Sequence, residues 1–162
     1  MIIYCDMDGV LCDFNRAAAR IAGVKTINQW SKLPEKERWK PIREHGGFWE
    51  TMPWKGDGKM LWNYIKRHNV HILSAYVSSI SDPNCIPGKR KWLSKNVNVS
   101  PSKIHLVKRR QKQNYATDSK GKPNILIDDF ISNINDFKRR GGIGIYHKTS
   151  SQTISALKKL GF

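Results

Sequence analysis

Five short apolar runs recur along the chain, and most of them are rich in β-branched residues. They cover residues 2–5, 70–73, 104–107, 124–127 and 143–146. Apolar residues largely follow one another in these runs instead of alternating with polar ones, which is typical of strands buried on both faces of a sheet. The pattern therefore predicts five buried strands.

Segments with helical spacing of apolar residues lie between and after these runs, and glycines close several of them. The predicted faces are Phe14, Ala17, Ala18 and Ile21; Leu61, Tyr64, Ile65 and His68; Ile131, Ile134 and Phe137; and Ile154, Leu157 and Leu160. Alternating strands and helices favour a Rossmann-like α/β fold, in which a parallel five-stranded sheet lies between helices.

One long segment does not follow this alternation. Residues 24–56 contain no convincing strand and hold four of the six tryptophans, and residues 32–44 are typical of a polar helix with Pro34 near its start. We therefore expect a core formed by residues 1–14 and 57–162, with a small helical cap formed by residues 15–56.

The net charge of +16 in 162 residues is concentrated in one part of the chain. Residues 89–122 carry eleven basic side chains and one acidic one. Such a stretch indicates contact with an anionic partner, nucleic acid included, although a solvated basic face gives the same pattern.

Other features exclude several classes of protein. No apolar run approaches the roughly 20 residues that span a bilayer, and Asp6 and Asp8 interrupt the segment where a signal peptide needs apolar residues. The three cysteines show no metal-ligand or disulfide spacing. We expect a soluble cytoplasmic protein with no membrane contact and with reduced cysteines; its oligomeric state, a homodimer included, is left open.

Scarce acidic residues occur as two pairs, each directly after an apolar run. Asp6 and Asp8 follow residues 2–5, and Asp128 and Asp129 follow residues 125–127. In a parallel sheet both pairs emerge at the carboxyl edge, where open α/β folds place their sites. Clustered carboxylates repel one another unless a cation neutralises them, and ligands that are all oxygen favour Mg²⁺. The sequence therefore predicts a magnesium site at this edge.

The motif Asp6-Met7-Asp8-Gly9-Val10-Leu11 resembles the first motif, DxDGxL, of the haloacid dehalogenase (HAD) superfamily of phosphotransferases. Three further motifs follow in the family's order: a strand that ends in Ser74, a lysine near the start of a helix (Lys89), and a strand that ends in Asp128-Asp129. The resemblance covers nearly the whole chain and implies the HAD fold and a HAD-type phosphatase.

The resemblance also implies roles for the four aspartates. Asp6 would attack phosphorus and form an aspartyl phosphate, while Asp8 would protonate the leaving oxygen and then activate water. Mg²⁺ would be held by the Asp6 carboxylate, the Asp8 backbone carbonyl and Asp128, and Asp129 would orient a metal-bound water.

The resemblance also implies that four other residues lie around the phosphate. The Ser74 hydroxyl and the Ala75 backbone N–H would bind the phosphate, and Lys89 would balance the charge of Asp6 and the phosphoryl group. Lys91 competes with Lys89 for this role. Gly9 allows a sharp turn beside the ligand.

Five stretches carry a narrower likeness: residues 6–14, 47–49, 88–93, 106–109 and 125–129. Through them the chain looks most like the 5'(3')-deoxyribonucleotidases of the superfamily, which are 5'-nucleotidase-like phosphoric monoester hydrolases. That likeness implies a nucleoside monophosphate as substrate, with aromatic rings at Phe14, Phe48 and Trp49 around the base. Lys108 and Arg109 would bind the phosphate or the ribose edge. The family commonly has hydroxyls at two successive positions after the second strand, and here the second position is Ala75.

The sequence leaves two alternative functions open. A polynucleotide 3'- or 5'-end phosphatase would use the same aspartates and would follow a nucleic-acid backbone with residues 89–122. A non-enzymatic basic nucleic-acid-binding protein would share the charge, but the intact acids at both metal-binding positions disfavour it.

Overall fold

The five strands form one parallel sheet in this computed structural model, which describes residues 1–78 and 82–162. The strands are β1 (Ile3–Cys5), β2 (Val70–Ala75), β3 (Ile104–Val107), β4 (Ile125–Asp128) and β5 (Ile143–Tyr146). Their order across the sheet is β3-β2-β1-β4-β5, so the strand order reverses between β1 and β4. Open α/β folds bind ligands beyond the carboxyl ends of the strands at such a point. The predicted α/β class with a parallel five-stranded sheet is confirmed.

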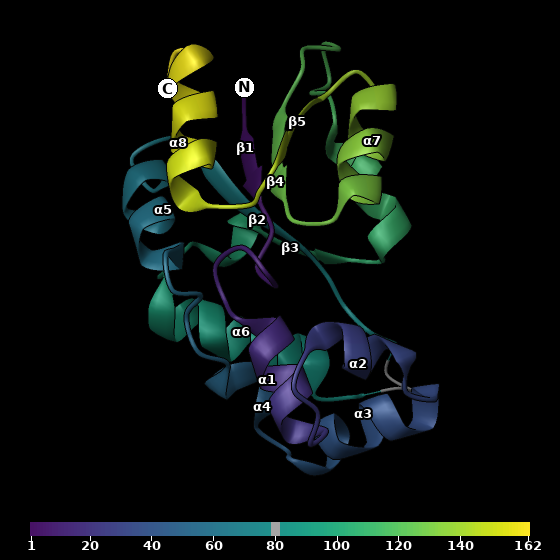
Figure 1. Ribbon diagram of the computed structural model, residues 1–162. Helices are drawn as coiled ribbons and strands as arrows, with labels where there is room; N and C mark the ends of the chain where they lie inside the picture. The colour runs from purple at the N-terminus through teal and green to yellow at the C-terminus, as the bar shows by residue number, and fades with distance from the viewer. Residues whose placement is uncertain (79–81) are drawn as a thin grey trace.

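Helices cover both faces of this sheet (Figure 1). One face packs against α5 (Gly58–Ile65), α6 (Cys85–Asn96) and α8 (Ser150–Lys159); the other packs against α7 (Ile131–Arg139) and the 3₁₀ segment η2 (Arg109–Tyr115). A short 3₁₀ turn, η1 (Pro101–Lys103), precedes β3. Because neighbouring strand residues point to opposite faces, Ile3 and Cys5 contact the first group of helices and Tyr4 the second.

Four helices gather beyond the carboxyl ends of the strands (Figure 1). They are α1 (Phe14–Ile21), α2 (Ile27–Lys32), α3 (Glu35–Glu44) and α4 (Phe48–Thr51), here called the helical insert. The insert packs on the core where α4 contacts α6. This close contact depends on Gly88 of α6, which has no side chain. A Cβ at Gly88 would lie 2.6 Å from the Trp49 Cβ.

The helix predicted over residues 32–44 is confirmed as α3, but it begins three residues later, at Glu35, and the separate short helix α2 ends before it. Thr26 starts α2 with a capping box shared with Gln29, and the chain becomes extended at Leu33 before α3 begins. The physical reason is Pro34, since the residue before a proline is driven out of the helical region.

No helix in the described part of the chain combines the length and the apolar character that a membrane crossing needs.

Candidate functional site

The ends of β1 and β4 bring the predicted acidic residues together. The Asp6 backbone N–H donates to the Ile127 carbonyl at 2.9 Å, so the two strand ends are joined at this point. Carboxylate oxygens of Asp6, Asp128 and Asp129 lie within 4.8 Å of one another. Asp6 is 6% exposed and Asp128 is fully buried. Both pairs therefore meet at the carboxyl edge of the sheet, where the sequence predicted them.

A tight turn follows β1 and depends on Gly9. Gly9 has a φ of +75°, and a Cβ at this position would lie 2.0 Å from the Asp129 Oδ2. The Lys55 ammonium donates to the Gly9 carbonyl at 2.5 Å. The turn that carries Asp8 thus passes directly against Asp129, which is possible only because residue 9 has no side chain.

A buried lysine that the sequence analysis missed offsets part of the negative charge of this group. The Lys112 Nζ lies 2.8 Å from the Asp6 Oδ2 and 2.7 Å from the Asp128 Oδ2, and Lys112 is 1% exposed. It comes from η2, between β3 and β4. No local signal separates Lys112 from the other basic residues around it, because its burial results from the path of η2 against the sheet.

Lys89, which was predicted to balance the charge of Asp6, is buried beside Asp8. It is fully buried, and its Nζ donates to the Asp8 Oδ2 at 2.6 Å, to the Ser74 hydroxyl at 3.1 Å and to the Ala75 carbonyl at 2.6 Å. Its direct partner is therefore Asp8, whereas Lys112 is the lysine that contacts Asp6. The competing Lys91 lies on the surface and pairs with Glu50.

Burial and mutual repulsion divide the pKa values of the three clustered carboxyls. Burial by itself would raise the pKa of Asp6, but Lys112 and Lys89 outweigh it and hold that pKa below its usual value. Burial and the charge of Asp6 raise the pKa of Asp128 to about 6, although Lys112 opposes this. Burial and the same charge raise the pKa of Asp129 to about 7. Asp6 is therefore kept ionised, while its negative charge makes Asp128 and Asp129 easier to protonate.

Hydrogen bonds hold the Asp128 carboxylate in place. Its Oδ1 accepts from the Phe130 backbone N–H at 2.8 Å, and the Asn133 side-chain amide donates to both of its oxygens, at 3.0 and 2.9 Å. Asn133 lies in the first turn of α7 and is 6% exposed. Sequence reasoning missed it as well, because an asparagine at the start of a helix usually serves the helix itself.

The donor set fits a hard divalent cation. The three clustered groups offer only oxygen ligands, and the raised pKa values of Asp128 and Asp129 show that Lys112 alone does not neutralise them. Asp6, Asp128 and Asp129 are therefore the residues that could hold Mg²⁺. The side chain of Asp8 lies outside this group and faces Lys89.

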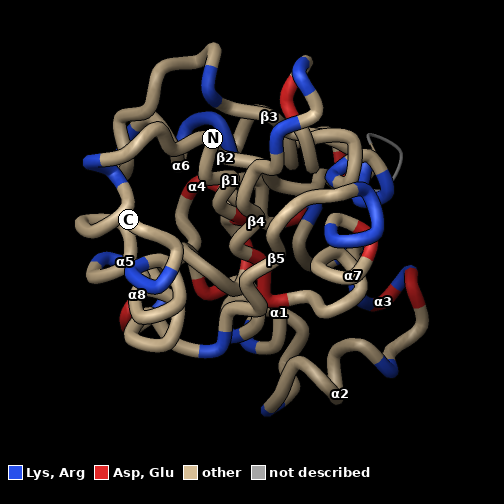
Figure 2. Tube along the Cα trace, turned by 90° about the horizontal axis from the view of Figure 1, so that it is seen from above, with Lys and Arg blue, Asp and Glu red and all other residues tan. Residues whose placement is uncertain are grey.

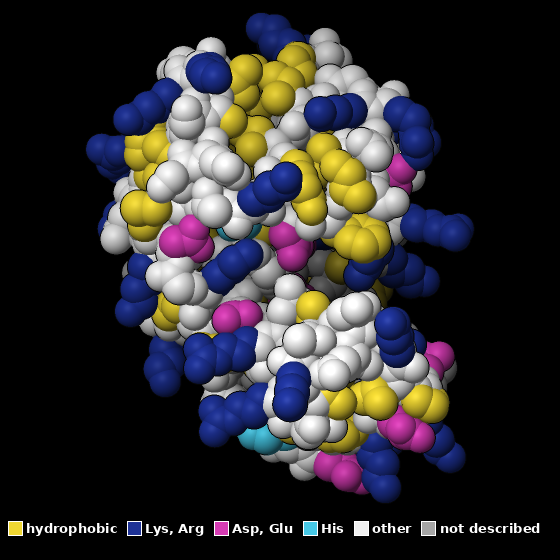
Figure 3. Space-filling model, in the orientation of Figure 1, with side chains coloured by type: hydrophobic (Ala, Val, Ile, Leu, Met, Phe, Trp, Pro, Cys, Tyr) yellow, Lys and Arg dark blue, Asp and Glu magenta, His cyan; other side chains and the backbone are white. Residues whose placement is uncertain are grey.

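A cavity of about 540 Å³ opens between the strand ends and the helical insert. Figure 3 shows the hollow between these two parts of the molecule. On the core side it is lined by Asp6, Asp8, Ala75, Tyr76, Val77, Arg109, Lys112, Asp129, Phe130 and Asn133. On the insert side it is lined by Phe14, Asn15, Ile27, Trp30, Ser31, Arg38, Trp39 and Trp49. Its volume is in the range of small-molecule sites.

The three aromatic residues predicted around a base do not share one environment. Phe14 and Trp49 line the cavity and stack on each other, with ring centroids 5.7 Å apart. Trp49 is 2% exposed, with Trp39 stacked at 6.5 Å and the Lys89 ammonium 5.1 Å from its ring centroid. Phe48 is buried and lines a separate pocket. Phe14 therefore faces the cavity, the ring of Trp49 is largely covered, and Phe48 lies outside.

The basic stretch divides into buried and exposed residues. Lys89 and Lys112 are buried in the site, while Lys108, Arg109 and Arg110 are exposed. Arg109 also lines the cavity, with its guanidinium 4.4 Å from the centroid of the Phe130 ring. In Figure 2 the acidic segments at the ends of β1 and β4 lie near the centre of the molecule, and most Lys and Arg segments lie around them.

Comparison with solved structures identifies the fold class. A hydrolase from Streptococcus pneumoniae TIGR4 is similar over 97% of each chain, with a TM-score of 0.59 and 9% identity. A HAD family enzyme from Bacteroides thetaiotaomicron, solved with magnesium and inorganic phosphate, is similar over 91% of this chain and 94% of its own, with a TM-score of 0.49 and 15% identity. The protein thus has the Rossmann-like α/β fold of the streptococcal hydrolase. No protein-family profile matches the sequence, and no curated protein matches it either.

Proposed function

We propose that the protein is a HAD-type phosphatase that hydrolyses phosphomonoesters with the help of Mg²⁺. The observation that carries this proposal is the buried carboxylate group at the strand ends, which has two buried lysines and faces one cavity. The DxDGxL motif at Asp6 and the fold shared with a hydrolase support it. Mg²⁺ would be held by the carboxylates of Asp6 and Asp128 and, as the HAD resemblance implies, by the Asp8 carbonyl, with Asp129 beside them, and it would supply positive charge for the carboxylates and the phosphate oxygens.

Asp6 is the proposed nucleophile. Lys112 keeps its carboxylate ionised, so an oxygen of Asp6 can attack phosphorus while the bond to the leaving oxygen breaks. Asp8 gives the leaving oxygen its proton and then takes one from the water that hydrolyses the aspartyl phosphate. Phosphate is released and the Asp6 carboxylate is restored.

Lys89 is the proposed link between Asp8 and the phosphate. It holds Asp8, Ser74 and the Ala75 carbonyl together through one ammonium group. The Ser74 hydroxyl and the Ala75 backbone N–H would then donate to the phosphate oxygens, where charge accumulates during transfer.

Nucleoside monophosphates are the proposed substrates, through the likeness to 5'(3')-deoxyribonucleotidases. The cavity supports this class because aromatic rings from both sides line it: Phe14 and Trp39 from the insert, and Phe130 from the core. Stacking on such rings holds any base with modest selectivity. Arg109, whose guanidinium lies against the Phe130 ring in the cavity wall, is the proposed contact to the ribose or phosphate edge.

Hydrolysis of p-nitrophenyl phosphate, with Mg²⁺ and with EDTA, tests the reaction. We expect activity only with Mg²⁺, and a loss of about 10³-fold or more in Asp6→Asn, because the nucleophile is removed. Asp136→Asn is the matched control, since Asp136 lies on α7 and pairs with the exposed Arg139. Equal rates for wild type and Asp6→Asn would overturn the proposal.

A second candidate, a polynucleotide-end phosphatase, is favoured by the exposed Lys108, Arg109 and Arg110 beside the cavity. A panel of deoxynucleoside monophosphates and end-phosphorylated oligonucleotides at two salt concentrations separates the two. Oligonucleotide hydrolysis that is preferred and falls steeply with salt would support this candidate. A shallow salt dependence with monophosphates preferred supports the first.

A further inference from the structure

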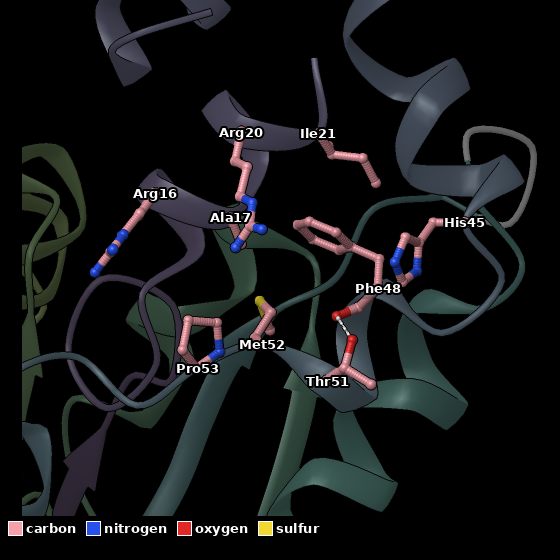
Figure 4. A pocket seen from close by; sticks show the side chains of 9 residues that line it. All are labelled: Arg16, Ala17, Arg20, Ile21, His45, Phe48, Thr51, Met52 and Pro53. Carbon is pink, nitrogen blue, oxygen red and sulfur yellow. Dashed lines mark hydrogen bonds between the residues drawn. The ribbon is translucent and has the colours of Figure 1, made fainter. Parts of the chain in front are cut away.

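A second pocket lies in the helical insert, apart from the cavity with the aspartates. Its volume is about 630 Å³, and its walls come from α1, from the end of α3 and from residues 48–53 (Figure 4). None of the predicted catalytic or metal-binding residues lines it. Phe48 is the one predicted substrate-binding residue that does.

The floor of this pocket is apolar. Its apolar lining comes from Ala17 and Ile21 of α1 and from Phe48, Met52 and Pro53. Phe48 is 5% exposed and Met52 is 4% exposed, so the pocket reaches well-packed side chains. Such a floor favours the apolar body of an organic molecule over a bare inorganic ion.

Positive charge is concentrated at the mouth of the pocket. Arg16 and Arg20 stand one turn apart on α1, and neither forms an ion pair with any carboxylate of residues 1–78 or 82–162. Figure 4 shows Arg20 directed into the pocket between Ala17 and Met52, and Arg16 directed outwards. Arg20 is therefore the arginine that an anion in the pocket would meet.

We propose that this pocket binds an organic anion, a molecule with an apolar body and one carboxylate, sulfonate or phosphate group. The anionic group would form charge-assisted hydrogen bonds with Arg20, while the body lies on Phe48 and Met52. The exposed His45 stands on the opposite wall and offers a further donor. The proposal is independent of the phosphatase reaction.

The pocket lies where the insert joins the core. The Asp13 backbone N–H donates to the Pro53 carbonyl at 2.9 Å, so the outgoing and returning segments meet beside the pocket. Phe48 also contacts Phe14, whose ring lines the cavity with the aspartates, with centroids 5.9 Å apart. A bound anion would therefore brace the junction of the insert and the core.

Titration with the fluorescent probe anilinonaphthalene sulfonate (ANS) tests the site in the full chain. Arg20→Met keeps the apolar stem and removes the charge, so we expect about a tenfold higher Kd for ANS. Arg20→Lys should restore part of the affinity. Arg139→Met, an exposed arginine of α7, is the matched control and should leave the Kd unchanged. Ala17→Trp should abolish binding because the new ring fills the pocket.

Hydrogen exchange with and without ANS locates the probe. We expect slower exchange in peptides that cover residues 13–21 and 47–54, with no change in residues 104–115. An unchanged Kd in Arg20→Met, an equal loss in Arg139→Met, or protection confined to the strand ends would each overturn the proposal. Near-ultraviolet circular dichroism of each variant identifies ANS binding that comes from unfolding.

Discussion

The strand ends and the helical insert face each other across one cavity, but they are built by different means. At the strand ends, Asp6 and Asp128 are positioned by backbone hydrogen bonds and share the ammonium of one buried lysine. In the insert, rings position one another: Phe14 stacks on Trp49, and Trp49 stacks on Trp39. The backbone thus constrains the groups assigned to chemistry, whereas side-chain packing constrains the groups assigned to substrate selection. Changes at the strand ends should therefore have the larger effects.

Lys112→Met should cause the largest change in stability. Removing the ammonium leaves the buried carboxylates of Asp6 and Asp128 without their partner, which should lower the free energy of unfolding by about 3 kcal/mol. Urea denaturation measures this. Lys40→Met is the control, because Lys40 and Glu44 form an exposed pair on α3 that should contribute about 0.5 kcal/mol or less. A similar loss in both variants would mean that burial of the pair does not matter.

Gly9→Ala should be the next most damaging change. The new Cβ would meet Asp129, so we expect a loss of about 100-fold or more in kcat for p-nitrophenyl phosphate. Gly23→Ala is matched to it, because Gly23 has a similar φ of +71° and no atom near the position of the Cβ. Gly23→Ala should lower stability by about 1 kcal/mol and leave kcat unchanged. Equal kcat values in the two variants would place the Gly9 turn outside the reaction.

Phe14→Ala probes the insert. It should have a smaller effect, confined to the choice between substrates. Loss of a stacking ring should raise KM about tenfold for a nucleoside monophosphate and leave KM for p-nitrophenyl phosphate nearly unchanged. Phe48→Ala, in the other pocket, should not change the ratio of the two KM values. If both substrates lose equally in Phe14→Ala, the ring only packs the insert.

The smallest effect is expected from two histidines in the sheet itself. His71 Nδ1 and His105 Nε2 lie 2.9 Å apart, beside the rings of Tyr4 and Tyr115 and near Lys103. Burial lowers the pKa of both histidines, and for His71 the neighbouring His105 and Lys103 lower it further.

Because these folded-state pKa values lie below the unfolded value of about 6.5, the unfolded chain binds protons more readily. The stability they contribute is complete above pH 6.5 and is lost as the pH falls through the lowered values. Replacing His105 with Gln should reduce the drop in unfolding free energy between pH 7.5 and 5.5 by less than about 1 kcal/mol. A larger drop in the variant than in the wild type would mean that folding raises the pKa of His105 instead of lowering it.

The elements and the acidic edge could be predicted from the sequence because they depend on local patterns. Five apolar runs with helices between them imply a parallel sheet, and acids directly after two of those runs must emerge at one edge. Asp6 and Asp128 meet there for that reason. The start of α3 at Glu35 is equally local, because Pro34 drives Leu33 out of the helical region.

By itself, then, the sequence determined the fold class, the edge that carries the site and the four aspartates found there. Only the tertiary structure decided which lysine neutralises which aspartate: Lys112 contacts Asp6, and Lys89 contacts Asp8. It also decided that Phe14 faces the cavity, whereas Phe48 lines the other pocket. The physical reason is the distance along the chain between the residues that interact. Strand ends follow from neighbouring residues, whereas the burial of a lysine or a ring depends on how segments far apart in the chain pack together.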